Sequence, residues 1–277
     1  MSDIWESIKG TKVLSSEETD LLDRQNSRLV TEFKANQLET DARRNWDLFY
    51  KRNDTRFFRD RHWTTREFQE LIDENDGDSK RVLLEVGCGV GNFVFPLIED
   101  QFNKNYFIYA CDFSQRAIDF VQQNPLYNED IIRAFQCDIT TDTIFETIKP
   151  NSVDIISMIF VLSAIHPTKF ETVLRAMFRL LKPGGTLLFR DYGLHDMAQI
   201  RFKPGNKIGE KFYMRQDGTR SYYFSTDELD ELVRSVGFDI LANEYVHRKT
   251  INIKENVDKD RIFVQSKFKR PQNTLAE

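Results

Sequence analysis

Three glycines at alternate positions, Gly87, Gly89 and Gly91, follow a short apolar run. They belong to the stretch RVLLEVGCGVGN at residues 81–92. An apolar run of this length that ends in glycines predicts a buried strand that turns tightly into a helix. Because glycine has no Cβ, the backbone of such a turn can approach a ligand closely. The stretch therefore predicts a loop that binds a nucleotide-like cofactor.

The acidic residue that follows this loop narrows the class of cofactor. Asp112 ends the apolar stretch YFIYACD, about 20 residues beyond the loop, where a doubly wound sheet places the carboxylate that binds ribose hydroxyls. Dinucleotide-binding folds need a glycine at position 92, which here is Asn92. The shorter spacing, with Glu85 two residues before the first glycine, instead fits a loop that binds S-adenosylmethionine (SAM). A glycine-rich turn without a ligand is the alternative, and the acid at 112 argues against it.

Two further pairs have both a cofactor-binding and a structural interpretation. Asp138 and Ile139 follow the next predicted strand, across the crevice from Asp112. The Asp138 carboxylate can accept from the amino group of adenine, or it can cap the next short helix. Trp46 and Tyr50 are four residues apart on one face of a predicted helix. They can close over the cofactor or anchor the helix to the sheet, and position alone favours anchoring.

The cysteines and one histidine are candidates for other chemistry. Cys88, Cys111 and Cys137 each fall at the carboxyl end of a predicted strand. None has a C-x-x-C partner, so small buried thiols are favoured over metal ligands, and no metal is expected. His166 precedes Pro167, which opens a helix. That position favours a role in local geometry over one as a general base.

The composition sets the outer limits. A chain of 277 residues that is 40% hydrophobic can bury a sizeable core, and one α/β domain with an added segment is expected. No apolar run approaches the roughly 18 residues of a membrane span, and the N-terminus has no secretory pattern. We therefore expect a cytoplasmic protein, with the nucleus as a second location, and no membrane partner. The net charge of −5 argues against indiscriminate nucleic-acid binding, and DNA is not an expected partner.

Two basic segments stand out against this net negative charge. Residues 41–67 interleave eight basic residues with six aromatic ones. A second basic insertion lies between Asp191 and Ser221, at the rim of the sheet that carries the glycine loop. Basic side chains bind phosphates and aromatic faces stack on bases, so both segments predict RNA binding. The candidate RNA-binding residues are Arg59, Arg61, His62, Arg201, Arg215 and Arg220.

The elements that must position these residues alternate as in a doubly wound fold. Parallel strands are expected before the glycine loop, at 106–111, before 137, at 153–160 and at 186–190. Helices at 92–101 and 114–123 lie between strands, and a capped helix in STDELDELVRSVGF precedes an antiparallel pair at 238–247 and 262–268. The predicted fold class is α/β: a Rossmann-like class I SAM-dependent methyltransferase. Its sheet is seven-stranded and mainly parallel, with a C-terminal antiparallel strand pair, an N-terminal helical segment and a mid-chain basic insertion.

Longer stretches carry a resemblance to a known family. They are WDLFYKRN, FFRDRHW, LLEVGCGVGN, CDFSQRAIDFV, NPLY, FQCDIT, IFVLSAIHP, LKPGG, FRDYG and FYMRQDGTRSYYF. Together they resemble the methyltransferase-like family that makes N3-methylcytidine in the tRNA anticodon loop, over nearly everything from Trp46 to Phe268. FFRDRHW, FRDYG and RQDGTRSYYF are the most specific. Short, and without a long N-terminal extension, the chain looks most like the member that acts on serine tRNAs.

The resemblance implies SAM contacts that overturn the anchoring preference at positions 46 and 50. The implied positions are Trp46, Tyr50, Gly87, Asp112, Asp138, Ile139 and Ile159, to which the loop itself adds Gly89 and Gly91. The resemblance also implies cytidine 32 of the tRNA as the target. Seryl-tRNA synthetase is implied as the partner that selects the tRNA, which would explain an acidic protein with only local basic patches.

The same reasoning divides the chain into segments. Residues 1–40 are expected to be a partly flexible acidic segment, and residues 41–72 a basic, aromatic helical segment that covers the cofactor and binds tRNA. The methyltransferase domain is expected at 80–268, with an RNA-binding insertion at 192–221 and a flexible tail at 269–277.

Asp191 and Arg190, in FRDYG at the end of the last parallel strand, are the catalytic candidates. Cytosine N3 carries an in-plane lone pair at neutral pH, so methyl transfer needs no prior deprotonation and creates a cationic base. The Asp191 carboxylate can accept from the exocyclic amine and stabilise that cation, and Arg190 can reach O2 or a phosphate. A salt bridge or helix cap is the structural alternative. The competing functions are a small-molecule methyltransferase, a dinucleotide oxidoreductase and a non-catalytic binding module.

Overall fold

A computed structural model describes residues 4–8, 10–72, 80–100, 105–252 and 257–272. Its main sheet has eight strands. In sheet order they are β1 (Ile4–Ile8), β10 (Asp239–Asn252), β11 (Val257–Lys269), β6 (Leu181–Tyr192), β5 (Val153–Ile159), β2 (Arg81–Val86), β3 (Tyr106–Asp112) and β4 (Ile132–Gln136).

The five strands from β4 to β6 run parallel, and β11, β10 and β1 continue the sheet antiparallel. The predicted seven-stranded, mainly parallel sheet with its closing antiparallel pair is therefore confirmed. Strand β1 adds an eighth, at the edge beside β10, which the sequence did not predict. Strands β10 and β11 are longer than predicted because they pair with each other as far as Asn252 and Val257.

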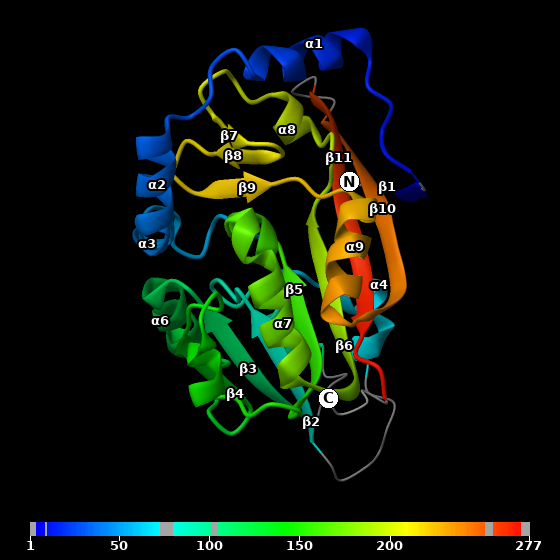
Figure 1. The fold of residues 1–277 in the computed structure, drawn as a ribbon. Coiled ribbons are helices and arrows are strands. Elements are labelled where there is room, and N and C mark those ends of the chain that lie inside the picture. The colour runs from blue at the N-terminus through cyan, green and yellow to red at the C-terminus, as the bar shows by residue number, and fades with distance from the viewer. Residues whose placement is uncertain (1–3, 9, 73–79, 101–104, 253–256, 273–277) are drawn as a thin grey trace.

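Helices cover both faces of the sheet, as expected where parallel strands are apolar throughout. Helices α7 (Phe170–Leu180) and α9 (Thr226–Val236) pack on the face turned to the viewer in Figure 1. Helices α5 (Val94–Glu99) and α6 (Gln115–Gln123), with α4 (Thr64–Glu67), lie on the other face. The sequence predicts Ser114 as the cap of α6, and this is confirmed because the Ser114 side chain accepts from the Ala117 N–H. The polar stretch DENDGDSK at residues 73–80 predicts a loop before β2, but all of it except Lys80 lies outside the described residues.

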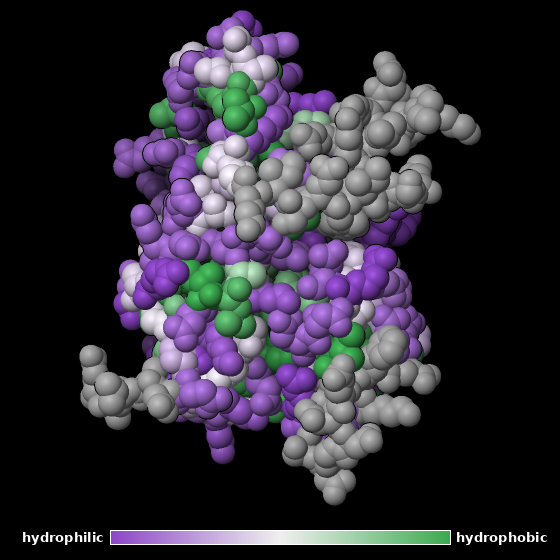
Figure 2. Space-filling view, turned by 90° about the vertical axis from the view of Figure 1, so that its right-hand side faces the viewer, coloured by the Kyte–Doolittle hydropathy of each residue, from purple (hydrophilic) through white to green (hydrophobic). Residues whose placement is uncertain are grey.

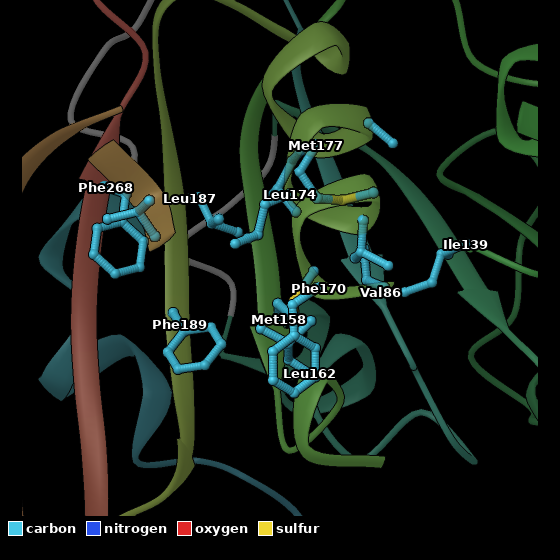
Figure 3. Packing of buried hydrophobic residues seen from close by; sticks show 14 of the residues in the cluster. Val86, Ile139, Met158, Leu162, Phe170, Leu174, Met177, Leu187, Phe189 and Phe268 are labelled. Atoms are coloured by element: carbon cyan, nitrogen blue, oxygen red, sulfur yellow. The ribbon is translucent and has the colours of Figure 1, made fainter. Parts of the chain in front are cut away.

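The core divides along the sheet because successive residues of a strand point to opposite faces. Leu187 and Phe189 of β6 belong to the same cluster as Leu174 and Met177 of α7, and Figure 3 shows Leu187 pointing toward Leu174. Leu188, between them, belongs to the separate cluster on the other face. All five side chains are fully buried, so this pattern fixes the strand's register and the face on which each helix lies.

The N-terminal segment forms helices that dock on the mid-chain insertion, at the top left of Figure 1. The helices are α1 (Ser16–Gln25), α2 (Glu32–Thr40) and α3 (Ala42–Asn53). The insertion contains α8 (Met197–Ile200) and a second sheet of β7 (Lys207–Gly209), β8 (Phe212–Met214) and β9 (Arg220–Tyr222). The buried Gln25 amide donates to the Gln199 and Ile200 carbonyls at 2.9 and 3.2 Å, which ties α1 to α8. The sequence SSEETDLL, with serines followed by acids, predicts a helix start, and a capping box between Ser15 and Glu18 confirms it.

Short 3-10 helices complete the described elements. They are η1 (Gln69–Leu71), η2 (Asp142–Glu146), η3 (Leu162–Ala164) and η4 (Pro167–Lys169). On the face shown in Figure 2, hydrophobic residues form only small patches among polar ones. Across the described residues, no helix has the length and apolar character to cross a bilayer.

Candidate active site

A cavity of about 280 Å³ opens at the carboxyl ends of β2, β3, β4 and β5. The chain passes from β2 to β3 and β4 on one side, and then crosses to β5 and β6 on the other side of β2. Ligands of doubly wound folds bind where the strand order reverses in this way. Eight of the nine predicted cofactor residues line the cavity: Trp46, Tyr50, Gly87, Gly89, Asp112, Asp138, Ile139 and Ile159. Gly91 does not line it. The fold thus gathers residues from four strand ends and from α3 around one space.

The glycine loop leaves no room for side chains. A Cβ on Gly89, where φ is +55°, would lie 3.0 Å from the Tyr50 hydroxyl oxygen and intrude on the cavity. At Gly91, where φ is +91°, a Cβ would lie 2.2 Å from the Phe95 ring. Gly89 therefore keeps the cavity open, whereas Gly91 allows the close packing of α5 beneath the loop.

Two backbone hydrogen bonds orient the Asp112 carboxylate at the cavity wall. Its Oδ2 accepts from the Gly89 N–H and its Oδ1 from the Ser114 N–H, both at 2.9 Å. Burial raises the pKa of Asp112 from 3.8 to about 6. Ribose hydroxyls would donate to this carboxylate and favour its ionised form. The cavity and its acceptor thus fit the adenosine part of SAM.

Asp138 lies at the cavity and shapes the turn that follows β4, but it is not the helix cap that the sequence offered as an alternative. Its Oδ1 accepts from the backbone N–H and the hydroxyl of Thr140, at 2.9 and 2.7 Å, so it shapes the turn before η2. The helix cap itself is Thr141 and not Asp138. Asp138 also lines the cavity beside Ile139, where an adenine amino group could reach it.

Helix α3 covers the cavity and is anchored at the same time. Trp46 and Tyr50 both line the cavity, with ring centroids 6.1 Å apart. Tyr50 is buried in a small cluster with Phe49, and Asp47 accepts from the Ser114 hydroxyl at 2.5 Å. Anchoring and cofactor contact are therefore compatible for this pair.

The catalytic candidates lie behind the cavity wall. Asp191 is fully buried and accepts from the Ser163 and Tyr192 N–H groups, each at 2.9 Å, and burial raises its pKa to about 6. Arg190 is 1% exposed; its Nη1 donates to Gln265 at 2.8 Å, and burial lowers its pKa to about 9. Neither side chain lines the cavity. Their catalytic roles remain predictions, and the contacts show each in a structural environment.

Phe160 is a site residue that the sequence reasoning missed. It lines the cavity with φ of +59°, a strained value for a non-glycine residue. Its N–H donates to the Arg190 carbonyl at 2.7 Å, and its ring lies 5.0 Å from that of Tyr192. In the sequence Phe160 continues the apolar run of β5, so nothing distinguished it from a core residue.

The six RNA-binding candidates divide by exposure. The side chains of Arg59, His62 and Arg201 are exposed, whereas those of Arg61, Arg215 and Arg220 are partly or fully buried. The Arg215 guanidinium lies 5.0 Å from the Tyr192 ring, and Arg61 lines the cavity. Arg220 is 6% exposed and also lines the cavity.

Arg220 is paired with Glu39 of α2, which also accepts from Lys169 Nζ at 2.6 Å. These two cations lower the pKa of Glu39 against the effect of its burial. Glu39 and Lys169, like Arg220, line the cavity, and no sequence motif pointed to them.

The three cysteines are free, buried and line the cavity. Burial is the main cause that raises the pKa of the Cys88 and Cys111 thiols well above their usual range. Among the described residues, no group of three His, Cys, Asp or Glu side chains is arranged to hold a metal ion.

Comparison with known proteins identifies the family. The family model described as "Methyltransferase domain" matches residues 57–243. The human tRNA N(3)-cytidine methyltransferase METTL6 is 53% identical over 94% of this chain and 91% of its own. The fission yeast tRNA N(3)-methylcytidine methyltransferase trm141 is 41% identical over 87% of this chain and 97% of its own.

Among solved structures, a SAM-dependent methyltransferase from Methanosarcina mazei superposes with a TM-score of 0.53, at 17% identity, over 71% of this chain and 95% of that one. That likeness shows the fold alone. The cavity, the matching domain and the fold together establish SAM as the cofactor. This chain therefore belongs to the tRNA N(3)-cytidine methyltransferase family.

Proposed function

We propose that this methyltransferase modifies N3 of cytidine 32 in the anticodon loop of tRNA-Ser, acting with seryl-tRNA synthetase. The observation that supports an RNA substrate best is the position of α3. Trp46 and Tyr50 line the cofactor cavity, whereas Arg43, Arg44 and Arg52 of the same helix are exposed. A helix with one face on the cofactor and basic residues in solvent suits an anticodon arm brought to the methyl group. The names of the relatives support the base and the atom.

The chemistry asks little of a general base. SAM supplies an electrophilic methyl group, and cytosine N3 already has the lone pair that attacks it. The chain must expose the Watson–Crick edge of the base, hold N3 in line and favour the cation that forms. We assign Phe160 to stacking on the base and Asp191 to stabilising the cation. Asp191 oxygens accept from Ser163 and Tyr192, and carboxylate oxygens have further lone pairs for an exocyclic amine.

The test is methyl transfer from labelled SAM to purified tRNA-Ser, with and without seryl-tRNA synthetase, followed by nucleoside analysis. N3-methylcytidine formed mainly with the synthetase is the expected result. Product on threonine or arginine tRNAs only would support the same reaction but contradict tRNA-Ser as the substrate. No product on any tRNA would favour a small-molecule methyltransferase if SAM still raised the melting temperature, and a non-catalytic RNA-binding module if SAM did not.

The proposed compartment is the cytoplasm, with the nucleus as a second location. Fluorescence of the tagged full chain in cells would test it. A purely organellar signal would contradict the proposal.

A further inference from the structure

Arg61 belongs to the basic segment but lies inside the cofactor cavity. Arg59, two residues earlier, is exposed, whereas Arg61 lines the cavity. The backbone fixes this difference: the Arg61 N–H donates to the Asn92 carbonyl at 2.7 Å, and the Thr64 hydroxyl donates to the Arg61 carbonyl at 2.9 Å. The Asn92 amide in turn donates to Asp60 Oδ1 at 2.9 Å. The residue after the glycine loop thus holds the turn that delivers Arg61.

The Arg61 guanidinium lacks an anionic partner in the part of the chain that the structure describes. No described carboxylate lies within 4.0 Å of it. Glu85 and Asp191 act on it only at longer range, and burial lowers its pKa. Burial also raises the pKa of Glu85 well above its usual range, which shifts that carboxyl toward its neutral form. Arg61 is half-buried, and a partly buried cation without a counterion is unfavourable, so the site is suited to an anion from a ligand.

The position of Arg61 along the cavity indicates which part of the ligand it meets. Asp138 follows β4 and Asp112 ends β3, which places adenine and ribose at that side. The Arg61 guanidinium lies 5.8 Å from the Phe160 ring, just beyond β5. The strand order is β4, β3, β2, β5, so the ends of β4 and β5 are three strand spacings apart, about 14 Å. The amino-acid part of SAM lies at the end of the molecule away from adenine, and its only anion is a carboxylate.

We propose that Arg61 binds the carboxylate of the methionine part of SAM. This role replaces the RNA-binding role that the basic pattern predicts for Arg61, and leaves that role to exposed residues such as Arg59. It depends on the cofactor and on no particular tRNA. An RNA phosphate is the other anion that could reach Arg61, and it is disfavoured because Arg61 lines the cofactor cavity together with Trp46 and Tyr50.

The test compares SAM with decarboxylated SAM, which lacks only the carboxylate, by calorimetric binding to the RNA-free protein. Arg61→Gln should lower the affinity for SAM relative to decarboxylated SAM by at least about tenfold. The affinity for decarboxylated SAM should not fall. Arg59→Gln is the matched control and should leave both affinities unchanged while weakening tRNA binding.

Three results would overturn the proposal. An equal loss for both ligands would make Arg61 a structural residue of the cavity. Unchanged SAM affinity with weaker tRNA binding would make it a phosphate contact.

If Arg61→Gln does not fold, Arg61→Lys serves instead, because it keeps the charge but not the bidentate geometry. That variant should lose part of the preference for SAM over decarboxylated SAM, and a full wild-type preference would argue against a guanidinium–carboxylate contact. Because RNA is absent from the binding assay, failure of the tRNA-Ser assignment would leave these results unaffected.

Discussion

The side-chain amide of Asn92 donates to the carboxylate of Asp60 at 2.9 Å. This bond joins the end of the glycine loop to the basic segment that covers the cavity. The same amide donates to the Phe58 carbonyl at 3.3 Å, so one residue holds two points of that segment. Asn92 stands where a dinucleotide-binding loop would have glycine, and its side chain has a use here that glycine could not supply.

Asn92→Ala should therefore weaken the attachment of the segment around Phe58 and Asp60 to the glycine loop and leave the sheet folded. We expect a loss of about 1 kcal/mol in the free energy of unfolding and a several-fold weaker affinity for S-adenosylhomocysteine, measured by chemical denaturation and calorimetry. Asn128→Ala is the matched control, since Asn128 is exposed and its side chain accepts from the nearby Asp130 N–H. An Asn92 variant with unchanged ligand affinity would show that the bond does not position the cover.

Cofactor affinity should depend on pH through Asp112. Burial raises the pKa of Asp112 from 3.8 to about 6, so the folded, ligand-free protein holds this proton more tightly than the unfolded chain does. Its contribution to the free energy of unfolding is present below pH 3.8 and is lost as the pH rises through about 6. Ribose hydroxyls favour the ionised form, so binding of S-adenosylhomocysteine should release a proton and weaken below about pH 6, approaching about tenfold per pH unit.

Calorimetry in buffers on both sides of that pH measures this dependence. Asp112→Asn should bind more weakly but with little pH dependence. A variant that keeps the wild-type pH profile would assign the dependence to another group.

Asp191→Ala should abolish methyl transfer and leave SAM affinity nearly unchanged. It should also lower the free energy of unfolding by about 1–3 kcal/mol, because the buried N–H groups of Ser163 and Tyr192 lose their acceptor. Asp191→Asn keeps one acceptor oxygen and should be the more stable variant, yet remain inactive. Loss of SAM binding in either folded variant would make Asp191 a cofactor or structural residue.

Exposed arginines should carry the salt-dependent part of tRNA binding. Arg52→Ser with Arg59→Ser should lower tRNA affinity and reduce the slope of log affinity against log salt by about 1.4–1.8. Arg133→Ser, exposed on β4, is the control for a general loss of positive charge. Equal slopes for all variants would remove residues 52 and 59 from the RNA interface. Arg220 is less suitable for this test, because replacing it would leave Glu39 with one partner fewer.

The sequence by itself determined the fold and the cofactor loop. Mainly apolar runs such as Val153–Ile159 predict strands buried on both faces, and the glycine spacing with an acid at 112 predicts the cofactor loop. Helix periodicity likewise placed Trp46 and Tyr50 on one face. These features depend on residues close together in the chain, so they can be predicted without the fold.

Tertiary structure decided where the basic and acidic side chains of the site point. Arg59 and Arg61 have the same chemistry in the same segment, but the backbone at Arg61 is bonded to Asn92, 31 residues away, and the Arg61 side chain lines the cavity. Glu39 reaches the cavity because α2 docks near the loop after β5, a contact between distant segments. Burial and pairing are properties of the packed structure, so composition and spacing could predict a basic segment but could not divide it between RNA and cofactor.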